Sequence, residues 1–368
     1  MLSDRARAAA ETFALAQVEN DGACPCADIA LCKPISGPPL RAREIYGFGG
    51  GDGSTLDFAR VTTVAWASDT RLMCAAHKHG ARVILSAPKP ERVFLANATV
   101  RREWVAKAVR AVVNSFSDGL VFDWESPCAA GCAEQKAYIA LIGATRAALR
   151  RLSPSYQIST CVAWAPDDID GRDYDVVGLA AVSDMLYVMD YDTRSQVFDA
   201  CIAAANAPYY GMVKGISRYR DLGISASQLV LGVPWYGYRY PCLPGTGADA
   251  RFCPIRRVPF RGVACSDAAG SQVPVGAILQ RLRLNSTGGR QWDSTQGAPY
   301  FNTVEGNVTV QYWYDDVASL VPKYQYARRA GLRGVGPYVF MDVLGATPFF
   351  DAFDAFLLPA PSPPPPGR

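Results

Sequence analysis

This 368-residue sequence is poor in several features, and each shortage excludes a class of protein. Lys and Arg outnumber Asp and Glu by only 37 to 34, so the chain lacks the basic surface that nucleic acid or an anionic membrane would require. No apolar run approaches the roughly 18 residues of a membrane-spanning helix. Only two histidines occur, His77 and His79, which leaves a Ser-His-Asp triad few candidates. Both lie at the end of a predicted helix, where we expect a surface position or an interaction with the helix dipole.

Motifs for metals and cofactors are also missing. The glycine-rich stretch 47–53 has neither the G-x-G-x-x-G nor the G-x4-G-K-[ST] spacing of nucleotide-binding loops, and we interpret it as the loop after the first strand. The cysteines are spaced C-x-C, C-x5-C and C-x3-C, whereas zinc sites use paired C-x2-C spacings. We therefore expect no cofactor and no metal.

The 11 cysteines indicate an oxidising compartment, because most of them lie beside turn residues where disulfides would hold loops. Their number is odd, so at least one thiol is unpaired, and Cys161 in a strand-like run is our candidate. The pairing of the others stays open. Three N-x-S/T sequons, at Asn97, Asn285 and Asn307, favour a secreted or lysosomal glycoprotein.

Both ends of the chain differ in composition from the rest. The first 20 residues carry five charged side chains and no continuous apolar stretch, so they do not resemble a signal peptide. We expect residues 1–23 to form an N-terminal extension. Residues 357–368 are rich in proline and are predicted to be a tail or linker.

Hydrophobic residues make up 49% and charged residues 19% of the chain, which is typical of a globular protein. Short β-branched runs alternate with helical stretches, for example 99–113, 134–151 and 318–330. This alternation predicts parallel βαβ units, and eight of them predict a (β/α)8 TIM barrel with its active site at the carboxyl ends of the strands. The eight predicted strands are 44–47, 61–66, 82–85, 119–124, 157–164, 185–189, 229–233 and 334–339.

The spacing between the seventh and eighth strands breaks this rhythm. A structureless loop of that length would count against a barrel, so we predict a small α+β insertion domain at 238–312. It contains three cysteines, many prolines and glycines, and β-rich pieces such as 307–313. The barrel then consists of residues 24–237 and 313–356.

The segment 117–127 carries two carboxylates on one face of a predicted strand. With a period of two, Val121, Asp123 and Glu125 point to the barrel axis, and the apolar residues between them point to the helices. The two carboxylates are then roughly 6.6 Å apart along the strand. Like charges at that range raise one pKa, which would keep Glu125 protonated as a general acid. A solvated strand end is the alternative, but the preceding apolar run favours a partly buried barrel mouth.

The same segment carries a family resemblance. Asp118-Gly-Leu-Val-Phe-Asp-Trp-Glu125 resembles the D-G-x-D-x-D-x-E signature of glycoside hydrolase family 18, the chitinase family. The resemblance extends from about residue 24 to about residue 342, and several blocks are similar to an exo-acting, lysosomal hexosaminidase of that family. These blocks are 24–34, 72–77, 188–192, 195–196, 201–209, 231–238, 258–262 and 265–270.

The resemblance implies a reaction in which the 2-acetamido group of the substrate is the nucleophile and an oxazolinium ion is the intermediate. Glu125 would be the acid and then the base, Asp123 would accept a hydrogen bond from the acetamido N–H, and Tyr191 would bind the acetamido oxygen. No metal or cofactor is needed. Further substrate-binding residues are expected at the strand ends, although core packing is the alternative for each aromatic ring: Asp192, Met189, Trp164, Trp235, Tyr236 and Tyr338.

Two positions depart from the family pattern. Val121 stands where chitinases have the middle Asp of the signature, and Tyr338 stands where the family usually has a Trp under the sugar. We expect a monomeric glycosidase whose partner is an oligosaccharide: chitobiose, an N-glycan core or a chitin oligomer. A lectin without turnover is the main alternative, and Val121 is the residue that favours it. An endo-chitinase ranks lower, because the insertion resembles a version of the family with a short site.

Overall fold

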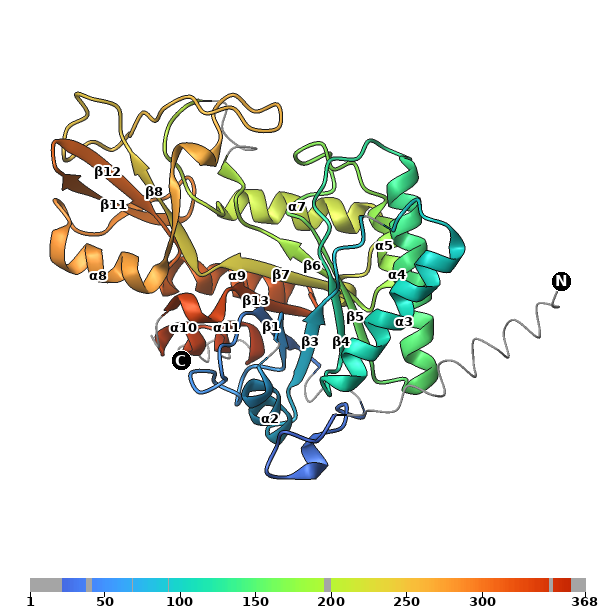
Figure 1. The fold of residues 1–368 in the computed structure, drawn as a ribbon. Coiled ribbons are helices and arrows are strands. Elements are labelled where there is room, and N and C mark those ends of the chain that lie inside the picture. Colours follow the sequence, from blue (N-terminus) through green and yellow to red (C-terminus); the bar gives the residue numbers. More distant parts are fainter. Residues whose placement is uncertain are drawn as a thin grey trace, which may run out of the picture.

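Eight parallel strands form a closed barrel in the computed structural model, which describes residues 22–37, 42–67, 69–91, 93–194, 200–343 and 347–358 (Figure 1). Around the barrel the order is β1-β13-β7-β6-β5-β4-β3-β2. Every predicted strand run overlaps one of these strands, so the TIM barrel is confirmed. The strands are β1 (Glu44–Phe48), β2 (Thr63–Ala65), β3 (Arg82–Ser86), β4 (Gly119–Phe122), β5 (Gln157–Ala163), β6 (Met185–Met189), β7 (Leu229–Pro234) and β13 (Gly334–Tyr338).

Helices cover the outside of the barrel (Figure 1). Several begin at a side chain that accepts a hydrogen bond from the first turn, as Asp69 does for α2 and Asp316 for α9, and each such cap stabilises its helix by about 1 kcal/mol. Short 3-10 turns lie at Ile29–Leu31, Ala226–Gln228, Asp267–Ala269 and Phe340–Val343. The helices are α2 (Thr70–Lys78), α3 (Ala98–Asn114), α4 (Ala133–Leu152), α5 (Val176–Val182), α7 (Tyr209–Asp221), α9 (Val317–Arg329), α10 (Pro348–Asp351) and α11 (Asp354–Leu357).

The two faces of β4 bury different side chains. Leu120 and Phe122 belong to the hydrophobic cluster that the barrel wall shares with the helices. Val121 belongs to a second cluster inside the barrel, with Tyr46 and Tyr187. The predicted alternation along this strand is therefore confirmed, and it aims the residues that follow Val121 on the same face toward the barrel mouth.

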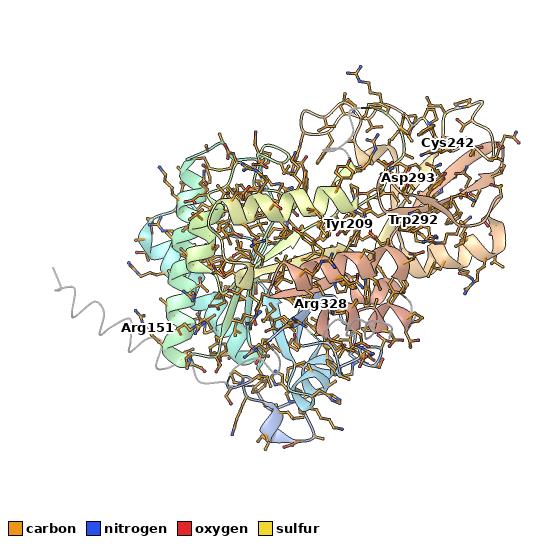
Figure 2. The ribbon with its side chains drawn as sticks, turned by 180° about the vertical axis from the view of Figure 1, so that it is seen from behind. Arg151, Tyr209, Cys242, Trp292, Asp293 and Arg328 are labelled. Atoms are coloured by element: carbon orange, nitrogen blue, oxygen red, sulfur yellow. A yellow bond between two sulfur atoms is a disulfide. The ribbon has the colours of Figure 1, made fainter. Side chains whose placement is uncertain are left out.

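A five-stranded antiparallel sheet is inserted between β7 and β13, in the order β10-β11-β12-β8-β9. It projects from one side of the barrel together with α8 (Figure 1), and Figure 2 shows Cys242, Trp292 and Asp293 in this part of the molecule. Its elements are β8 (Tyr236–Pro241), β9 (Ser271–Pro274), α8 (Val275–Asn285), β10 (Gln291–Asp293), β11 (Ala298–Glu305) and β12 (Val308–Trp313).

Ten of the 11 cysteines form disulfides, and Cys161 is the free one, as predicted. One bridge joins the chain after β6 to the insertion, which fixes the insertion beside the barrel mouth. The pairs are Cys24–Cys32, Cys26–Cys74, Cys128–Cys132, Cys201–Cys265 and Cys242–Cys253. Among the described residues, no helix is both long enough and apolar enough to cross a membrane. The predicted extension and tail lie largely outside the described residues.

The expected surface position of His77 is wrong, because the ring is buried between α2 and β4. Its Nδ1 lies 2.6 Å from the carbonyl oxygen of Leu31, and its Nε2 lies 2.9 Å from a carboxylate oxygen of Asp118. Asp118 also accepts from the backbone N–H groups of Ile35 and Val83. The first acidic residue of the signature therefore fastens the chain before β1 to the barrel and takes no part in the mouth.

Candidate active site

The carboxyl ends of β4, β5 and β6 open into a cleft of about 480 Å³, which the insertion closes on one side. A volume of this size is typical of a small-ligand site. The cleft brings together five of the predicted residues: Glu125, Trp164, Met189, Tyr191 and Asp192. The insertion contributes Tyr238, Phe260, Arg261 and the segment 266–272.

Glu125 lies three residues beyond β4, and its side chain is 49% exposed. Its carboxylate accepts a hydrogen bond from Nη1 of Arg172 at 2.7 Å. The guanidinium is buried, and its other nitrogens bond the carbonyl of Ile169 at 3.2 Å and the carboxylate of Asp170 at 3.3 Å. Backbone hydrogen bonds join this loop to Cys128 on both sides of Arg172. Sequence reasoning missed Arg172, because a loop residue between β5 and α5 has no periodicity that indicates its partner.

Asp123 lies deeper than Glu125 and is largely desolvated. Burial and, after it, the negative charge of Glu125 raise the pKa of its carboxyl to about 7, although Arg172 and a hydrogen bond from Cys161 oppose the rise. One oxygen, Oδ1, is buried and has no hydrogen-bond partner among the described residues. The Asp123 carboxyl therefore holds a proton at mildly acidic pH. The half-exposed carboxylate of Glu125 lies two residues farther along the chain.

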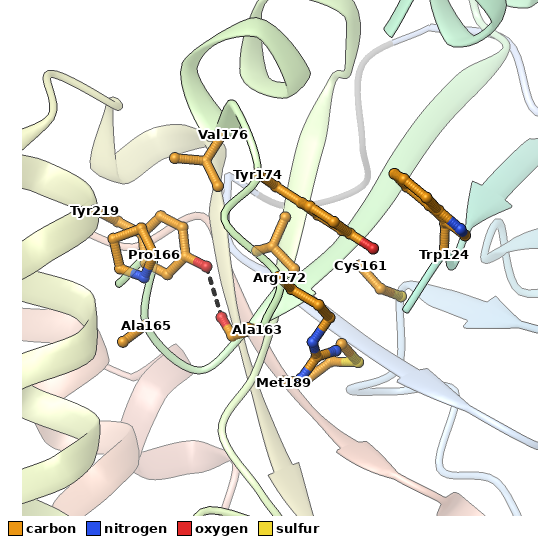
Figure 3. A pocket seen from close by; sticks show the side chains of 11 residues that line it. Trp124, Cys161, Ala163, Ala165, Pro166, Arg172, Tyr174, Val176, Met189 and Tyr219 are labelled. Carbon is orange, nitrogen blue, oxygen red and sulfur yellow. Dashed lines mark hydrogen bonds between the residues drawn. The ribbon is translucent and has the colours of Figure 1, made fainter. Parts of the chain in front are cut away.

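A much smaller cavity of about 10 Å³ lies behind the wall of the cleft. Figure 3 shows Cys161, Arg172, Trp124 and Tyr174 around it; the rings of Trp124 and Tyr174 stack with centroids 4.8 Å apart. This space is about the volume of one water molecule, so no sugar ring fits there.

Asp192 is held by hydroxyl groups from the insertion. Its Oδ1 accepts from Tyr236 at 2.6 Å and from Tyr238 at 2.8 Å, and Gln272 approaches Oδ2 at 3.3 Å. Burial raises the pKa of Asp192 to about 6, although the two tyrosine hydrogen bonds oppose this. The insertion thus fixes the position of a carboxyl that comes from the end of β6.

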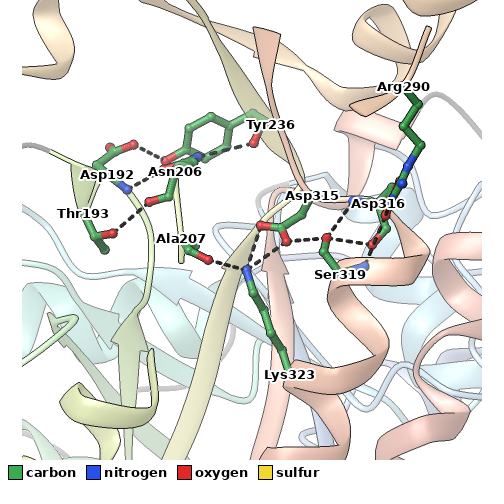
Figure 4. A network of polar contacts seen from close by, with 10 residues as sticks. All are labelled: Asp192, Thr193, Asn206, Ala207, Tyr236, Arg290, Asp315, Asp316, Ser319 and Lys323. Carbon is green, nitrogen blue, oxygen red and sulfur yellow. Dashed lines mark hydrogen bonds and ion pairs between the residues drawn. The ribbon is translucent and has the colours of Figure 1, made fainter. Parts of the chain in front are cut away.

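The loop that carries Asp192 is fastened to its surroundings by a polar network (Figure 4). Asn206 accepts from the backbone N–H of Asp192 at 2.6 Å and donates to the carbonyl of Tyr236 at 3.3 Å. Lys323 of α9 is fully buried; its ammonium donates to the carbonyl of Ala207 at 2.6 Å and to both oxygens of Asp315. These contacts tie the β6 end of the cleft to β8 and α9.

Two aromatic predictions need correction. Trp235 is fully buried on the outside of the barrel, where phenylalanines that include Phe349 and Phe353 surround its indole. Residues Leu231 and Val233 belong to the same outer cluster, so the two-residue period of β7 gives the reason and would have placed Trp235 correctly. Tyr236 has no exposed ring face, since only 3% of it is accessible, and it acts on Asp192 through its hydroxyl.

Tyr338 is half-buried at the end of β13 and contacts Tyr191, with ring centroids 5.4 Å apart. Its ring also contacts Phe48, Tyr236 and Trp66, the last edge-on at 5.3 Å. Trp66 follows β2 and is 36% exposed, so it offers a ring surface beside Tyr338. The sequence contained a signal for Trp66, because an aromatic residue directly after a barrel strand stands at the mouth.

Residues 72–339 match the sequence profile of glycosyl hydrolases family 18. The chain belongs to this family. It is 40% identical over 318 residues to "Di-N-acetylchitobiase" of Mus musculus, covering 86% of each chain. It is 39% identical over 354 residues to "Probable di-N-acetylchitobiase 2" of Dictyostelium discoideum, covering 90% of each.

Solved family 18 structures share the fold. A class V chitinase from Nicotiana tobaccum in complex with NAG4 superimposes with a TM-score of 0.69 at 16% identity, covering 85% of this chain and 98% of that one. A chitinase from Cycas revoluta in complex with (GlcNAc)3 gives 0.68 at 18% identity, covering 85% and 99%. The protein described here is thus a chitobiase-like family 18 glycosidase with the barrel of the chitinases.

Proposed function

We propose that this family 18 glycosidase cleaves the GlcNAc-β1,4-GlcNAc bond of chitobiose units, removes single residues from the reducing end, and retains the anomeric configuration. The observation that carries the proposal is the pair formed by Asp123 and Glu125. One carboxyl is desolvated and the other is half-exposed at the edge of the cleft. Two carboxyls in unlike environments take unlike roles in one reaction.

In the first step, Glu125 gives its proton to the glycosidic oxygen as the bond to the anomeric carbon breaks. The carbonyl oxygen of the substrate's 2-acetamido group attacks that carbon from the other face, which forms the oxazolinium ion and releases the reducing-end sugar. In the second step water attacks the same carbon, and the Glu125 carboxylate takes its proton. Two inversions give net retention.

Asp123 and Tyr191 act on the acetamido group. Asp123 accepts its N–H and balances the positive charge of the oxazolinium ion, and the Tyr191 hydroxyl donates to its oxygen. Burial raises the pKa of the Tyr191 phenol well above its ordinary value, so the hydroxyl keeps its proton and remains a donor. In the free enzyme the pair holds a proton mainly on Asp123 at mildly acidic pH, and the reactive complex requires that proton on Glu125.

The exo polarity is supported by the way the insertion limits the cleft. Phe260 and Arg261 stand at the rim, with the guanidinium 5.1 Å from the ring centroid, and both line the same cleft as Glu125. A bounded cleft admits few sugar rings on that side of the scissile bond, whereas cleavage inside a polymer needs a groove open at both ends.

Substrate assistance is tested with a chitotriose analogue whose sugar on the non-reducing side of the cleaved bond carries a free amine in place of the acetamide. We expect hydrolysis of chitotriose and none of the analogue, and ¹H NMR should show the new reducing end of the disaccharide product first as the β-anomer. Cleavage of the analogue at a similar rate would contradict the substrate-assisted mechanism, and a disaccharide released first as the α-anomer would contradict retention.

A binding protein without turnover is the second candidate. It is favoured by Val121, which gives Asp123 no polar neighbour on its own strand, and by the ion pair that engages Glu125 with Arg172. Calorimetry with chitotriose distinguishes the two: binding without any product, in the wild type as in Glu125→Gln, supports the lectin.

We also propose that the protein works as a secreted or lysosomal glycoprotein monomer. Five disulfides suit an oxidising compartment, and the three sequon asparagines are exposed. A mass decrease on treatment with an N-glycosidase, and a monomer in light scattering, are the expected results for protein from its native source.

A further inference from the structure

The free thiol of the protein lies beside Asp123 because of the strand register. β4 and β5 are parallel, with Val121 opposite Ser159 and Phe122 opposite Thr160. The next pair in this register is Asp123 and Cys161, and both face the barrel interior because Val121 and Cys161 belong to the same interior cluster. The Cys161 side chain is 3% exposed, and its thiol lies near enough to the Asp123 carboxyl to lower the pKa of that carboxyl as a hydrogen-bond donor.

Asp123 has few other polar neighbours. Val121 offers only hydrocarbon, and Oδ1 of Asp123 has no partner within the part of the chain that the structure describes. Burial raises the pKa of the Cys161 thiol well above its ordinary value, and the charges of Asp123 and Glu125 add to this. The group therefore stays a thiol, which is a hydrogen-bond donor, and does not become a nucleophilic thiolate.

The charged and titratable groups that face Asp123 come from most sides of the barrel. Glu125 and Arg172 act on it by charge, and the thiol of Cys161 acts by its hydrogen bond. The remaining groups are phenols that stay neutral: Tyr46, Tyr138, Tyr174, Tyr191 and Tyr338.

We propose that Cys161 is a positioning residue, whose thiol orients the Asp123 carboxyl toward the acetamido group of the substrate. This inference rests on the proposed function, in which Asp123 meets that group. The thiol supplies from β5 the donor that β4 lacks at Val121. The thiol also lowers the pKa of Asp123 and so favours its ionised form. Cys161 therefore affects both the charge and the orientation of this carboxyl.

The test compares Cys161→Ala with Cys161→Ser, because serine keeps a donor of similar size. We expect Cys161→Ala to lower kcat about tenfold, the effect of losing one hydrogen bond to a charged group, with KM changed little. Its pH profile should lose activity at higher pH than the wild type, since Asp123 keeps its proton longer. Cys161→Ser should stay within about threefold of the wild type.

Two further variants separate positioning from packing. Ser159→Ala removes a hydroxyl from the same face of β5, two residues farther from the mouth, and should leave kcat and the pH profile unchanged. Adding Val121→Asn to Cys161→Ala returns a donor to the neighbourhood of Asp123 and should restore most of the lost kcat. Wild-type kcat and pH profile in Cys161→Ala would overturn the proposal, as would equal losses in the Ala and Ser variants.

A measurement without substrate keeps this inference separate from the proposed function. All other cysteines are in disulfides, so the protein has a single S–H stretching band, which Cys161→Ser identifies by its loss. We expect the band to shift as Asp123 titrates near pH 7 and to lose that pH dependence in Asp123→Ala. A band that ignores both changes would overturn the role of Cys161, even if hydrolysis of chitotriose is confirmed.

Discussion

Replacing Asp123 with asparagine should stabilise the fold at neutral pH while it disables the reaction. The carboxyl has an ordinary pKa of 3.8, which burial raises to about 7 in the folded protein. Between these values the folded state binds a proton that the unfolded state does not, so the free energy of unfolding falls as the pH rises through this window. Above pH 7 the buried carboxylate is ionised and lowers the free energy of unfolding by its full amount. A pKa shift of this size corresponds to about 4 kcal/mol.

Asp123→Asn removes this titration. A buried amide has its own cost of about 1–3 kcal/mol if its hydrogen bonds are incomplete, but that cost does not depend on pH. The measurable quantity is therefore the change in unfolding free energy between variant and wild type at pH 8, minus the same change at pH 4. We expect this difference to favour the variant by about 4 kcal/mol.

Urea unfolding followed by tryptophan fluorescence at the two pH values gives the comparison. Asp249→Asn, which alters an exposed carboxylate of the insertion, is the matched control and should show a difference near zero. Equal effects of Asp123→Asn at both pH values would refute the argument that burial in the barrel mouth holds the proton on Asp123.

Three other outcomes follow from the site and the fold. Arg172→Met keeps the length of the side chain but removes the ion pair with Glu125. Because Glu125 is half-exposed, we expect kcat/KM with chitotriose to fall about tenfold. An unchanged rate would show that this ion pair does not position the acid. Hydrolysis should decline as the pH rises through about 7, where the pair loses its proton, and a flat profile to pH 9 would contradict this. Burial lowers the pKa of His77, but the hydrogen bond and charge of Asp118 raise it above its ordinary value of 6.5. The ion pair between His77 and Asp118 therefore stabilises the fold fully below pH 6.5, and this stabilisation is lost as the pH rises through the raised pKa. His77→Gln should therefore cost more stability at pH 5 than at pH 9 in thermal unfolding, and the reverse order would contradict the ion pair.

The barrel was predictable from the sequence because most of its strands are short apolar runs followed by a helical stretch. The same two-residue period predicted Val121 on the inner face of β4, where it lies, and directed Asp123 and Glu125, which follow the end of the strand, toward the barrel mouth. Applied to β7, the same period places Trp235 on the outside of the barrel with Val233, where the structure has it. The prediction of Trp235 in the site followed its aromatic character and not this alternation.

The contacts that complete the site depend on long-range packing. Arg172 reaches Glu125 from a loop 47 residues later in the chain, and no local pattern indicates this pairing. His77 became buried because the chain before β1, held by the Cys24–Cys32 and Cys26–Cys74 disulfides, covers the end of α2. The disulfide pairing itself was not predictable from spacing.

The most direct test of the proposed reaction uses chitotriose with an isotope label in its reducing-end sugar, incubated with the wild type and with Glu125→Gln at mildly acidic pH. We expect labelled monosaccharide and unlabelled disaccharide from the wild type, and no product from a Glu125→Gln variant that is folded and still binds the sugar. A labelled disaccharide as the first product would contradict cleavage from the reducing end. Equal turnover by the two proteins would contradict Glu125 as the acid.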